Sequence, residues 1–368
     1  MDFSYTEDEQ ALRELARKIL ADHVTQDRLR EVEKSDDRID RRAWSALAEA
    51  NLLGAALPEQ YGGSDMGLSA LAILLEEIGR AVAPVPAFAT LVLGALPVAE
   101  FGSQEQKQRL LPGVASGDVI LTASLVETGD SATSARRDGA GWRLEGVRPF
   151  VPAARIAHRV LVPARQESGR LGVFLVDPRS EGVSLETQET TNREIHCLIH
   201  LVSVRVPEKG LLGSPDRGEE ILGWTRDRAL LAQCAMQLGV ADRALRITAA
   251  YTAERKQFGR PVASFQAVHT RAADAFIDVE AMRLTLQRAL HLLAQGEPAA
   301  ESLAIARYFA CEGGARVTYA AQHLHGGIGV DLDYSLHRYT LWARQIGIYL
   351  GSGGSQLARL GEMLARES

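Results

Sequence analysis

The spacing of apolar positions divides the chain into a helical part, a part with short strands, and a second helical part. Thr6 and Glu9 have the spacing of a capping box, and apolar residues then recur every three or four positions through Leu20, which predicts a helix. Further helices are expected over residues 44–53, 68–81, 88–101 and 104–111. We therefore expect an all-helical N-terminal domain over residues 1–117.

From about residue 119 the pattern changes to short β-rich runs separated by Gly, Pro, Asp and Ser clusters. The expected strands cover residues 119–125, 141–147, 159–163, 172–177, 183–187 and 200–206. Six short strands with no helices between them predict a small antiparallel barrel or sandwich over residues 118–213. They disfavour a parallel nucleotide-binding sheet, which needs a helix between successive strands.

After residue 213 the helical period returns and continues to the end of the sequence. Four long helices are expected, over residues 225–254, 264–294, 299–324 and 334–366. In the second, one apolar stripe runs through Phe265, Val268, Ala272, Phe276, Val279, Met282 and Leu286. These helices predict a four-helix bundle over residues 214–368, and helices this long commonly pack against a second chain. The expected fold class is α+β.

Composition and charge exclude several classes of protein. The chain has 41 basic and 47 acidic residues without a block of like charges, which disfavours a nucleic-acid interface or a polybasic membrane anchor. No apolar stretch approaches the length that spans a bilayer, and the acidic start does not resemble a signal peptide, so we expect a cytoplasmic protein. The three cysteines are far apart and are expected to be buried, inert thiols.

The glycine-rich runs and the histidines lack the sequence context that a nucleotide or metal site requires. The glycines at 326–329 follow a helix rather than a strand, and those at 351–354 lack the lysine of a phosphate-binding loop. His323 and His325 have no third ligand at metal spacing, so no metal site is expected.

Four groups of segments, in order, resemble the acyl-CoA dehydrogenase family over nearly the whole chain. They are residues 57–63 (LPEQYGG), 102–107 (GSQEQK), 251–261 (YTAERKQFGRP) with 264–266 (SFQ), and 325–329 (HGGIG) with 333–339 (DYSLHRY). Members of that family have a helical N-terminal domain, a middle β-barrel and a C-terminal four-helix bundle. The resemblance therefore implies the same three parts that the hydrophobic pattern predicts.

The resemblance also implies an enzyme with FAD as cofactor and an acyl-CoA as substrate. In the family a carboxylate removes the α-proton of the thioester, and the β-hydrogen leaves as hydride to the flavin. FAD lies at a dimer interface, with its ring on one subunit's barrel and its diphosphate and adenosine on the neighbour's bundle. The residues that the resemblance assigns to the bundle side are Arg255, Gln257, Phe258, Gln266, His323, Gly326 and Gly327.

Physical chemistry supports part of this assignment. A diphosphate needs a fixed cation and close backbone approach, which Arg255 and the glycine pair would supply. An alternative for Arg255 is a salt bridge with Glu254. His323 stands where the family usually has a glutamine, which changes the contact expected at the adenosine end.

The position of the catalytic base departs from the family pattern. The family most often has a glutamate on the last helix, and the matching residue here is Leu350, which cannot accept a proton. A minority of members place the base at the start of the first bundle helix, where this chain has Asp227 followed by Arg228. Asp227 is therefore a candidate base, although its side chain is shorter. The alternative is an acid in the first turn of a helix, which the helix dipole favours.

The barrel has also lost residues that contact the flavin in the family. Val126 stands where a hydroxyl is expected, in a shortened loop that carries Asp130. The family's Trp-Ile-Thr segment matches residues 150–152, in which Pro152 has neither a hydroxyl nor an N–H. The bundle half of the FAD site is thus retained, whereas the base and the barrel half are degraded.

This asymmetry resembles the non-catalytic type of subunit in the actinobacterial heterotetrameric acyl-CoA dehydrogenases, which act on steroid side-chain CoA thioesters. The resemblance implies an α2β2 assembly with a catalytic homologue and an electron-transfer flavoprotein as acceptor. Three alternatives stay open: a self-sufficient homotetramer with Asp227 as base, a flavoenzyme of secondary metabolism with the same fold, and a structural scaffold without flavin.

Overall fold

The computed structural model describes residues 3–127 and 133–367, and for residue 367 the backbone only. Its contacts divide the chain into two compact units. The bundle unit comprises Met1–Leu29, Leu68–Ala83 and Leu230–Ser368, and the sheet unit comprises Arg30–Gly67 and Pro84–Ala229. Each unit is described by itself, and the predicted domain boundaries at residues 117 and 213 stay a prediction.

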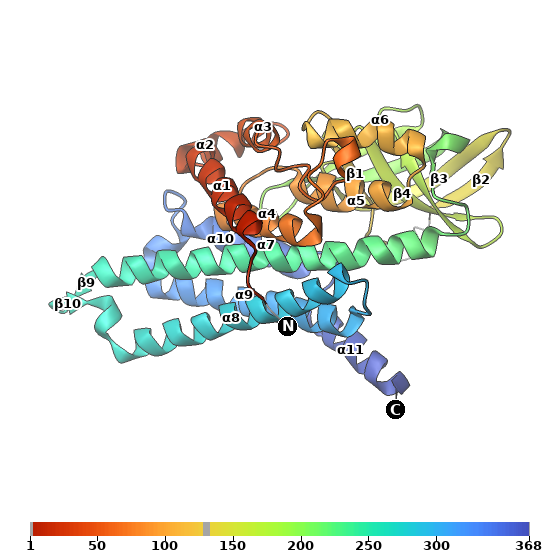
Figure 1. Ribbon diagram of the computed structural model, residues 1–368. Helices are drawn as coiled ribbons and strands as arrows, with labels where there is room; N and C mark the ends of the chain where they lie inside the picture. Colours follow the sequence, from red (N-terminus) through yellow and green to blue (C-terminus); the bar gives the residue numbers. More distant parts are fainter. Residues whose placement is uncertain (1–2, 128–132, 368) are drawn as a thin grey trace. The chain divides into compact units, whose positions relative to one another are not determined.

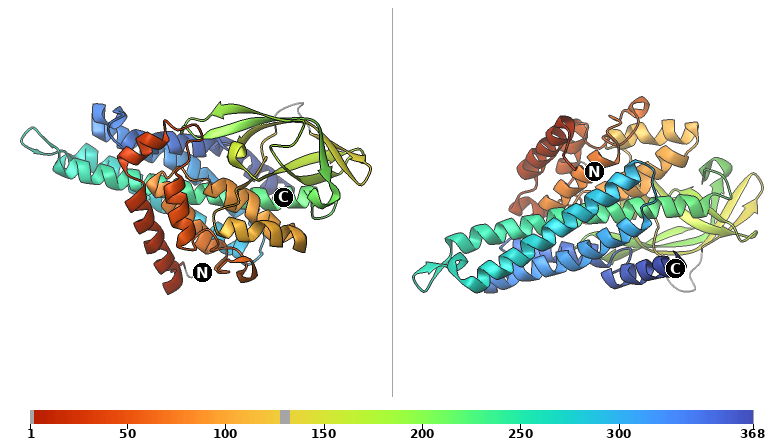
Figure 2. Two further views of the ribbon diagram at one scale, coloured as in Figure 1. Left: turned by 90° about the horizontal axis from the view of Figure 1, so that it is seen from above. Right: turned by 60° about the horizontal axis from the view of Figure 1, so that its bottom comes forward.

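The bundle unit is built from long helices (Figure 1). They are α1 (Glu7–His23), α4 (Gly67–Ala81), the C-terminal part of α7 (Gly218–Glu254), α8 (Gln266–Ala294), α9 (Ala300–His325), α10 (Leu336–Ile348) and α11 (Gly353–Glu367). Helices α8 and α9 lie side by side, and α10 and α11 both pack on α9 (Figure 2). The capping box at Thr6 is present and starts α1.

One expectation for the bundle was wrong. The helix expected over residues 334–366 is two helices, because Leu350 and Gly351 adopt φ angles of 62° and 105°, which a right-handed helix cannot accommodate. The apolar stripe of α8 is buried at Val279, Met282 and Leu286, but Phe276 within it is 57% exposed. The outer face of α8 therefore carries apolar surface that the unit itself does not cover.

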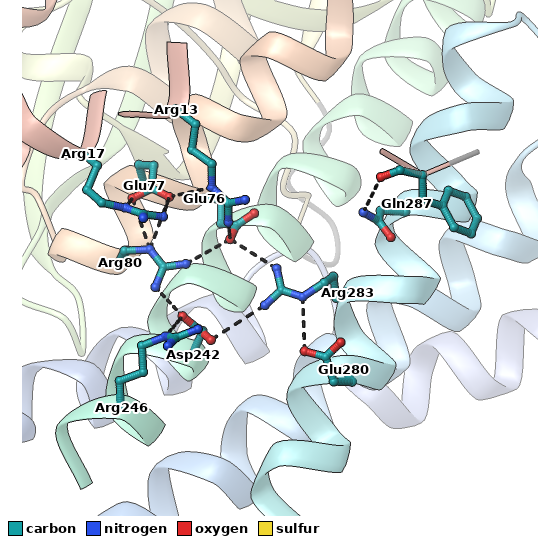
Figure 3. A network of polar contacts seen from close by, with 11 residues as sticks. Arg13, Arg17, Glu76, Glu77, Arg80, Asp242, Arg246, Glu280, Arg283 and Gln287 are labelled. Atoms are coloured by element: carbon teal, nitrogen blue, oxygen red, sulfur yellow. Dashed lines mark hydrogen bonds and ion pairs between the residues drawn. The ribbon is translucent and has the colours of Figure 1, made fainter. Parts of the chain in front are cut away.

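A cluster of buried charges ties α1 and α4 to the bundle helices (Figure 3). At its centre Arg80 of α4 pairs with Glu76, Glu77 and Asp242. The outer members of this charge network are Arg13, Arg17, Arg246, Glu280 and Arg283. Because the three central carboxylates are almost completely buried, they need these arginines to stay ionised.

The backbones of α4 and α7 touch beside this network. A Cβ added at Gly239 would lie 1.9 Å from the carbonyl oxygen of Glu76, and one added at Gly79 would lie 2.1 Å from that of Met236. Only glycine allows two helices to approach this closely, so these two positions fix where α4 crosses α7.

The sheet unit combines short helices with one eight-stranded sheet. Its helices are the end of α2 (Gln26–Val32), α3 (Arg41–Glu49), a π-helix (Phe88–Ala95), α5 (Leu96–Phe101), α6 (Gln104–Ala115) and the N-terminal part of α7. The strands are β1 (Leu121–Ala123), β2 (Ser134–Asp138), β3 (Gly141–Pro152), β4 (Arg159–Gln166), β5 (Leu171–Val176), β6 (Val183–Glu189), β7 (Ile195–Pro207) and β8 (Leu211–Leu212).

The strand order is β6-β7-β3-β2-β4-β5-β8, with β1 paired to β4. All six expected strands are present, whereas β2 and β8 were not expected from the sequence. Most pairs are antiparallel, but β4 runs parallel to β1 and β2, so the expectation of a purely antiparallel sheet was wrong. The interior packs around Trp142, Phe174 and Cys197.

Among the described residues, no helix is long and apolar enough to cross a bilayer.

Candidate functional site

The residues assigned to FAD on the bundle gather at one end of the bundle unit, where α7 and α9 finish and α8 begins (Figure 1). A small hairpin projects there, formed by β9 (Lys256–Gln257) and β10 (Arg260–Pro261). Its two turn residues, Phe258 and Gly259, have φ angles of 54° and 78°. Two positive φ values in a two-residue loop match the twist of a hairpin, and glycine takes one of them without strain.

The polar side chains of this hairpin face solvent. Arg255 and Gln257 are exposed, and the ring of Phe258 is 89% exposed. Arg255 makes no ion pair or side-chain hydrogen bond with any residue that the structure describes, so the alternative of a salt bridge to Glu254 finds no support. A cation held in place by its backbone but without an anion is available to bind one.

A glycine turn ends α9 beside the hairpin. Gly326 has φ 64° and donates its N–H to the carbonyls of Gln322 and His323, which ends the helix. A Cβ added at Gly326 or Gly327 would meet nothing within 4 Å, so the backbone here is open to a ligand. This is the arrangement that close approach of a diphosphate requires.

The other two candidates lie at the same end. Gln266 is exposed at the first residue of α8, and the neighbouring Phe265 packs edge-on against Phe258, with ring centroids 6.4 Å apart. His323 is exposed and stacks on Tyr319. The structure therefore brings all seven bundle-side candidates to one end of the unit, whereas no hydrogen bond or ion pair among the described residues joins Gln266 or His323 to Arg255.

Leu350, which the resemblance places at the usual position of the base, is buried in the break between α10 and α11. The guanidinium of Arg307 holds this break, because its Nη2 donates to the carbonyls of Ile346, Tyr349 (2.6 Å) and Gly351 (3.4 Å). These bonds satisfy carbonyls that the end of α10 leaves free. The backbone around the position is thus firmly held, while its side chain has no group that can take up a proton.

Asp227 lies in the part of α7 that belongs to the sheet unit, and its side chain is half-buried. The adjacent Arg228 stacks on Trp224, with its guanidinium carbon 3.5 Å from the ring centroid. Burial lowers the pKa of Arg228 to about 10, against the opposing effect of the Asp227 carboxylate. A carboxylate is therefore present beside a partly desolvated cation.

In the sheet unit, the segment that the resemblance places at the flavin makes hydrogen bonds and an ion pair with a neighbouring strand of its own unit. Arg148 is 1% exposed, and its Nε donates to the Ser124 hydroxyl (2.7 Å) while its Nη1 pairs with Glu127 (2.9 Å). The Ser124 hydroxyl, the nearest to Val126 along the described part of this segment, accepts a hydrogen bond from Arg148. The rest of the expected loop, including Asp130, lies outside the described residues.

The segment matched to Trp-Ile-Thr also offers little to a flavin ring. Val151 is fully buried, and the carbonyl of Pro152 accepts a hydrogen bond from the Thr122 hydroxyl (2.8 Å). Phe150 is 43% exposed with φ 52°, and its N–H donates to the Gln188 side chain (3.0 Å). Only the phenyl ring of Phe150 is left to contact a cofactor.

Comparison with known proteins decides the family. The family model described as "Acyl-CoA dehydrogenase, N-terminal domain" matches residues 6–118, and "Acyl-CoA dehydrogenase, C-terminal domain" matches residues 217–365. The chain is 38% identical to Acyl-CoA dehydrogenase FadE27 of Mycobacterium tuberculosis, over 99% of both chains. The chain belongs to the acyl-CoA dehydrogenase family. Members of this family are oxidoreductases that use FAD.

Two solved structures are particularly similar to this acyl-CoA dehydrogenase. One is a variant of the Tcur3481-Tcur3483 steroid ACAD, at 46% identity and a TM-score of 0.91, covering 98% of both chains. The other is the ChsE4-ChsE5 complex from Mycobacterium tuberculosis, at 38% identity and a TM-score of 0.95, covering 99% of both chains. The expected fold class and family are therefore confirmed.

The two halves of this acyl-CoA dehydrogenase differ in how well they fit FAD. The exposed Arg255 and the open backbone at Gly326 and Gly327 fit a diphosphate. The described part of the sheet lacks the hydroxyls that the resemblance places at a flavin ring, because Val126 and Pro152 stand at the matched positions and neither side chain can donate a hydrogen bond. A chain that completed only part of an FAD site would show this combination, in which the bundle fits the diphosphate and the sheet lacks the hydroxyls expected at the flavin ring.

Sequence reasoning missed two groups at these positions. It did not identify Arg307, which holds the break around Leu350, because nothing in its local sequence distinguishes it from an exposed helical arginine. It also missed Arg148, because the local sequence indicates a strand but not that this arginine is buried. Both depend on burial, which a single sequence does not reveal.

Proposed function

We propose that this chain is a subunit of an FAD-dependent acyl-CoA dehydrogenase, which contributes its bundle to an FAD site shared with a catalytic partner subunit. Similarity to the Tcur3481-Tcur3483 steroid ACAD and to the ChsE4-ChsE5 complex supports this proposal. The reaction is α,β-dehydrogenation of an acyl-CoA thioester, with a steroid side-chain CoA as the substrate class.

The observation that carries this proposal is the exposed Arg255 without an anionic partner among the described residues, set beside an open glycine turn. In the shared site Arg255 would donate charge-assisted hydrogen bonds to the FAD diphosphate, and Gly326 and Gly327 would let the phosphates approach the backbone. Gln257 and Phe258 would contact the nucleotide from the hairpin, with Gln266 and His323 at its adenosine end. FAD, when bound, accepts the β-hydrogen of the substrate as hydride.

In this proposal the partner subunit removes the α-proton, since Leu350 supplies no base. Because the sheet of this chain also lacks flavin contacts, the chain would hold one end of a cofactor that reacts on its partner. The assembly implied by the resemblance is an α2β2 heterotetramer, and an electron-transfer flavoprotein is the acceptor that we propose.

Replacing Arg255 tests the proposal. Loss of a charge-assisted hydrogen bond costs about 1.5–3 kcal/mol, so Arg255→Ala should weaken FAD binding by the complex roughly 10- to 100-fold. Arg288→Ala is the matched control, because Arg288 is an exposed arginine of α8 near the opposite end of that helix. Flavin retained after gel filtration is the readout. Equal flavin content in the two variants would overturn the shared site.

A second candidate is a self-sufficient homotetramer in which Asp227 is the base, which its half-buried position beside Arg228 favours. The proposal of a shared site predicts that Asp227→Asn leaves kcat of the complex within about threefold. A loss of roughly three decades in kcat with unchanged FAD content would identify Asp227 as the base instead.

A further inference from the structure

Three rings lie in contact beneath the candidate diphosphate site. The imidazole of His325 stacks on the ring of Tyr251, with centroids 4.3 Å apart and planes inclined by 17°. The ring of Tyr334 lies 5.3 Å from His325 and 6.5 Å from Tyr251. His325 is 4% exposed, and both tyrosines are half-buried. The contact therefore joins the last turns of α7 and α9 to the segment before α10.

Hydrogen bonds fix the orientation of the central imidazole. Nδ1 of His325 lies 2.8 Å from the carbonyl oxygen of Ala321, which can only accept, so Nδ1 carries the hydrogen. In the neutral ring Nε2 is then an acceptor, and it lies 3.2 Å from the hydroxyl of Tyr334, which donates to it. Burial lowers the pKa of His325, which keeps the ring neutral. One ring thus has both of its nitrogens satisfied by different segments.

Two of the three ring residues are followed closely in the chain by a candidate FAD residue. The backbone N–H of Arg255 donates to the carbonyl of Tyr251 (2.9 Å), so the arginine is one helical turn beyond the stacked ring. Gly326 follows His325 directly in the chain. Arg255 itself is exposed and has no side-chain bond to a described residue that would place it. The position of Arg255 relative to the glycine turn is therefore set through the backbone by the ring contact.

We propose that Tyr251, His325 and Tyr334 form a ring clamp that fixes Arg255 in position relative to the Gly326–Gly327 turn, so that the arginine meets the diphosphate of FAD. This inference rests on the proposed function, because it assumes that the bundle end binds FAD. The three residues are positioning residues: they act through Arg255 and the glycine turn rather than by touching the reacting atoms.

Tyr334→Phe tests the clamp with the smallest change, because it removes only the hydroxyl that donates to His325. We expect the dissociation constant for FAD of the flavin-depleted complex to rise about tenfold, measured by fluorescence titration with FAD. The matched control is Tyr61→Phe, which removes a hydroxyl that donates to Gln104 (2.7 Å) in the sheet unit. Both variants should lower the melting temperature of the flavin-depleted protein, but only Tyr334→Phe should weaken FAD binding.

A double-variant cycle separates positioning from a general structural effect. If the clamp acts through Arg255, Tyr334→Phe should weaken FAD binding by less than about threefold once Arg255 is already alanine. A full tenfold loss in that background would overturn the clamp, as would an unchanged dissociation constant in Tyr334→Phe alone. If Arg255→Ala alone leaves the affinity unchanged, the bundle site fails and the clamp fails with it. A failure of the clamp alone is thereby distinguished from a failure of the proposed function.

Discussion

Arg80 offers the sharpest test of how the bundle unit is held together. Its side chain is 13% exposed and pairs with three carboxylates, two on α4 and one on α7. Replacing it by methionine keeps an apolar stem of similar shape but removes the charge that Glu76, Glu77 and Asp242 share. Removing one partner of a buried ion pair commonly costs 3–5 kcal/mol, because a buried charge loses its compensation.

The structure places Arg80→Met at the lower end of that range. Each of the three carboxylates keeps another arginine, since Arg13 and Arg283 pair with Glu76, Arg17 with Glu77, and Arg246 with Asp242. We therefore expect a loss of about 3 kcal/mol, which corresponds to a fall in Tm of roughly 6–12 °C if the bundle unit, whose size lies in the range of about 150–250 residues, unfolds as one cooperative unit.

The control is Arg246→Met, whose side chain is 66% exposed while pairing with the same Asp242. Because the Arg246 side chain is exposed and the buried Asp242 keeps Arg80, the loss should be at most about 1 kcal/mol, and this variant should stay within about 4 °C of the parent protein. Arg80→Lys should fall between the two, because a single ammonium cannot serve three carboxylates in the geometry of a guanidinium. Thermal unfolding at one protein concentration is the assay. Equal Tm values for Arg80→Met and Arg246→Met would refute the reasoning from burial.

The remaining predictions concern packing, pH and thiols. Gly239→Ala should destabilise the protein by about 1–3 kcal/mol in chemical denaturation, because its Cβ would strike the backbone of α4, whereas Gly223→Ala, with open space around it, should be neutral or stabilising. Burial opposes ionisation of Asp242 and Glu77, but hydrogen bonds from arginines outweigh it and lower both pKa values. Their contribution to the free energy of unfolding should therefore be present at neutral pH and be lost as the pH falls below their ordinary pKa values of 3.8 and 4.5. In Arg80→Met the free energy of unfolding should fall less steeply over this pH range. Equal slopes of stability against pH in the variant and the parent protein would contradict this. A thiol reagent at pH near 8 should modify none of the three cysteines until the protein is unfolded, because all three are buried and burial raises the pKa of Cys234 to about 12. Rapid labelling of the native protein would contradict this.

Features carried by local sequence could be predicted, and those that depend on tertiary contact could not. The Arg255 to Gly259 motif was found because its residues are consecutive, and the capping box at Thr6 because its spacing is fixed. Strand β2 was missed because its sequence, SARRD, lacks apolar alternation, and β8 because it has two residues. The break at Leu350 was missed because leucine rarely adopts a positive φ.

The candidate site shows the same division. Its seven bundle-side residues come from three segments, and motif spacing identified each segment without placing it beside the others. The ring contact of Tyr251, His325 and Tyr334 joins residues of three different elements, so no local pattern indicates it. The network around Arg80 likewise connects α4 to Asp242, which lies 162 residues further along the chain.

The central claim is that this acyl-CoA dehydrogenase chain completes an FAD site on another subunit rather than holding a whole site of its own. The most direct test measures the FAD content of the chain purified alone and of the chain co-expressed with a catalytic homologue. FAD content is obtained from the visible flavin absorbance and the protein concentration. We predict protein without flavin when the chain is alone, and about one FAD for every two chains in the complex. About one FAD per chain in the protein purified alone would contradict it and favour the self-sufficient homotetramer.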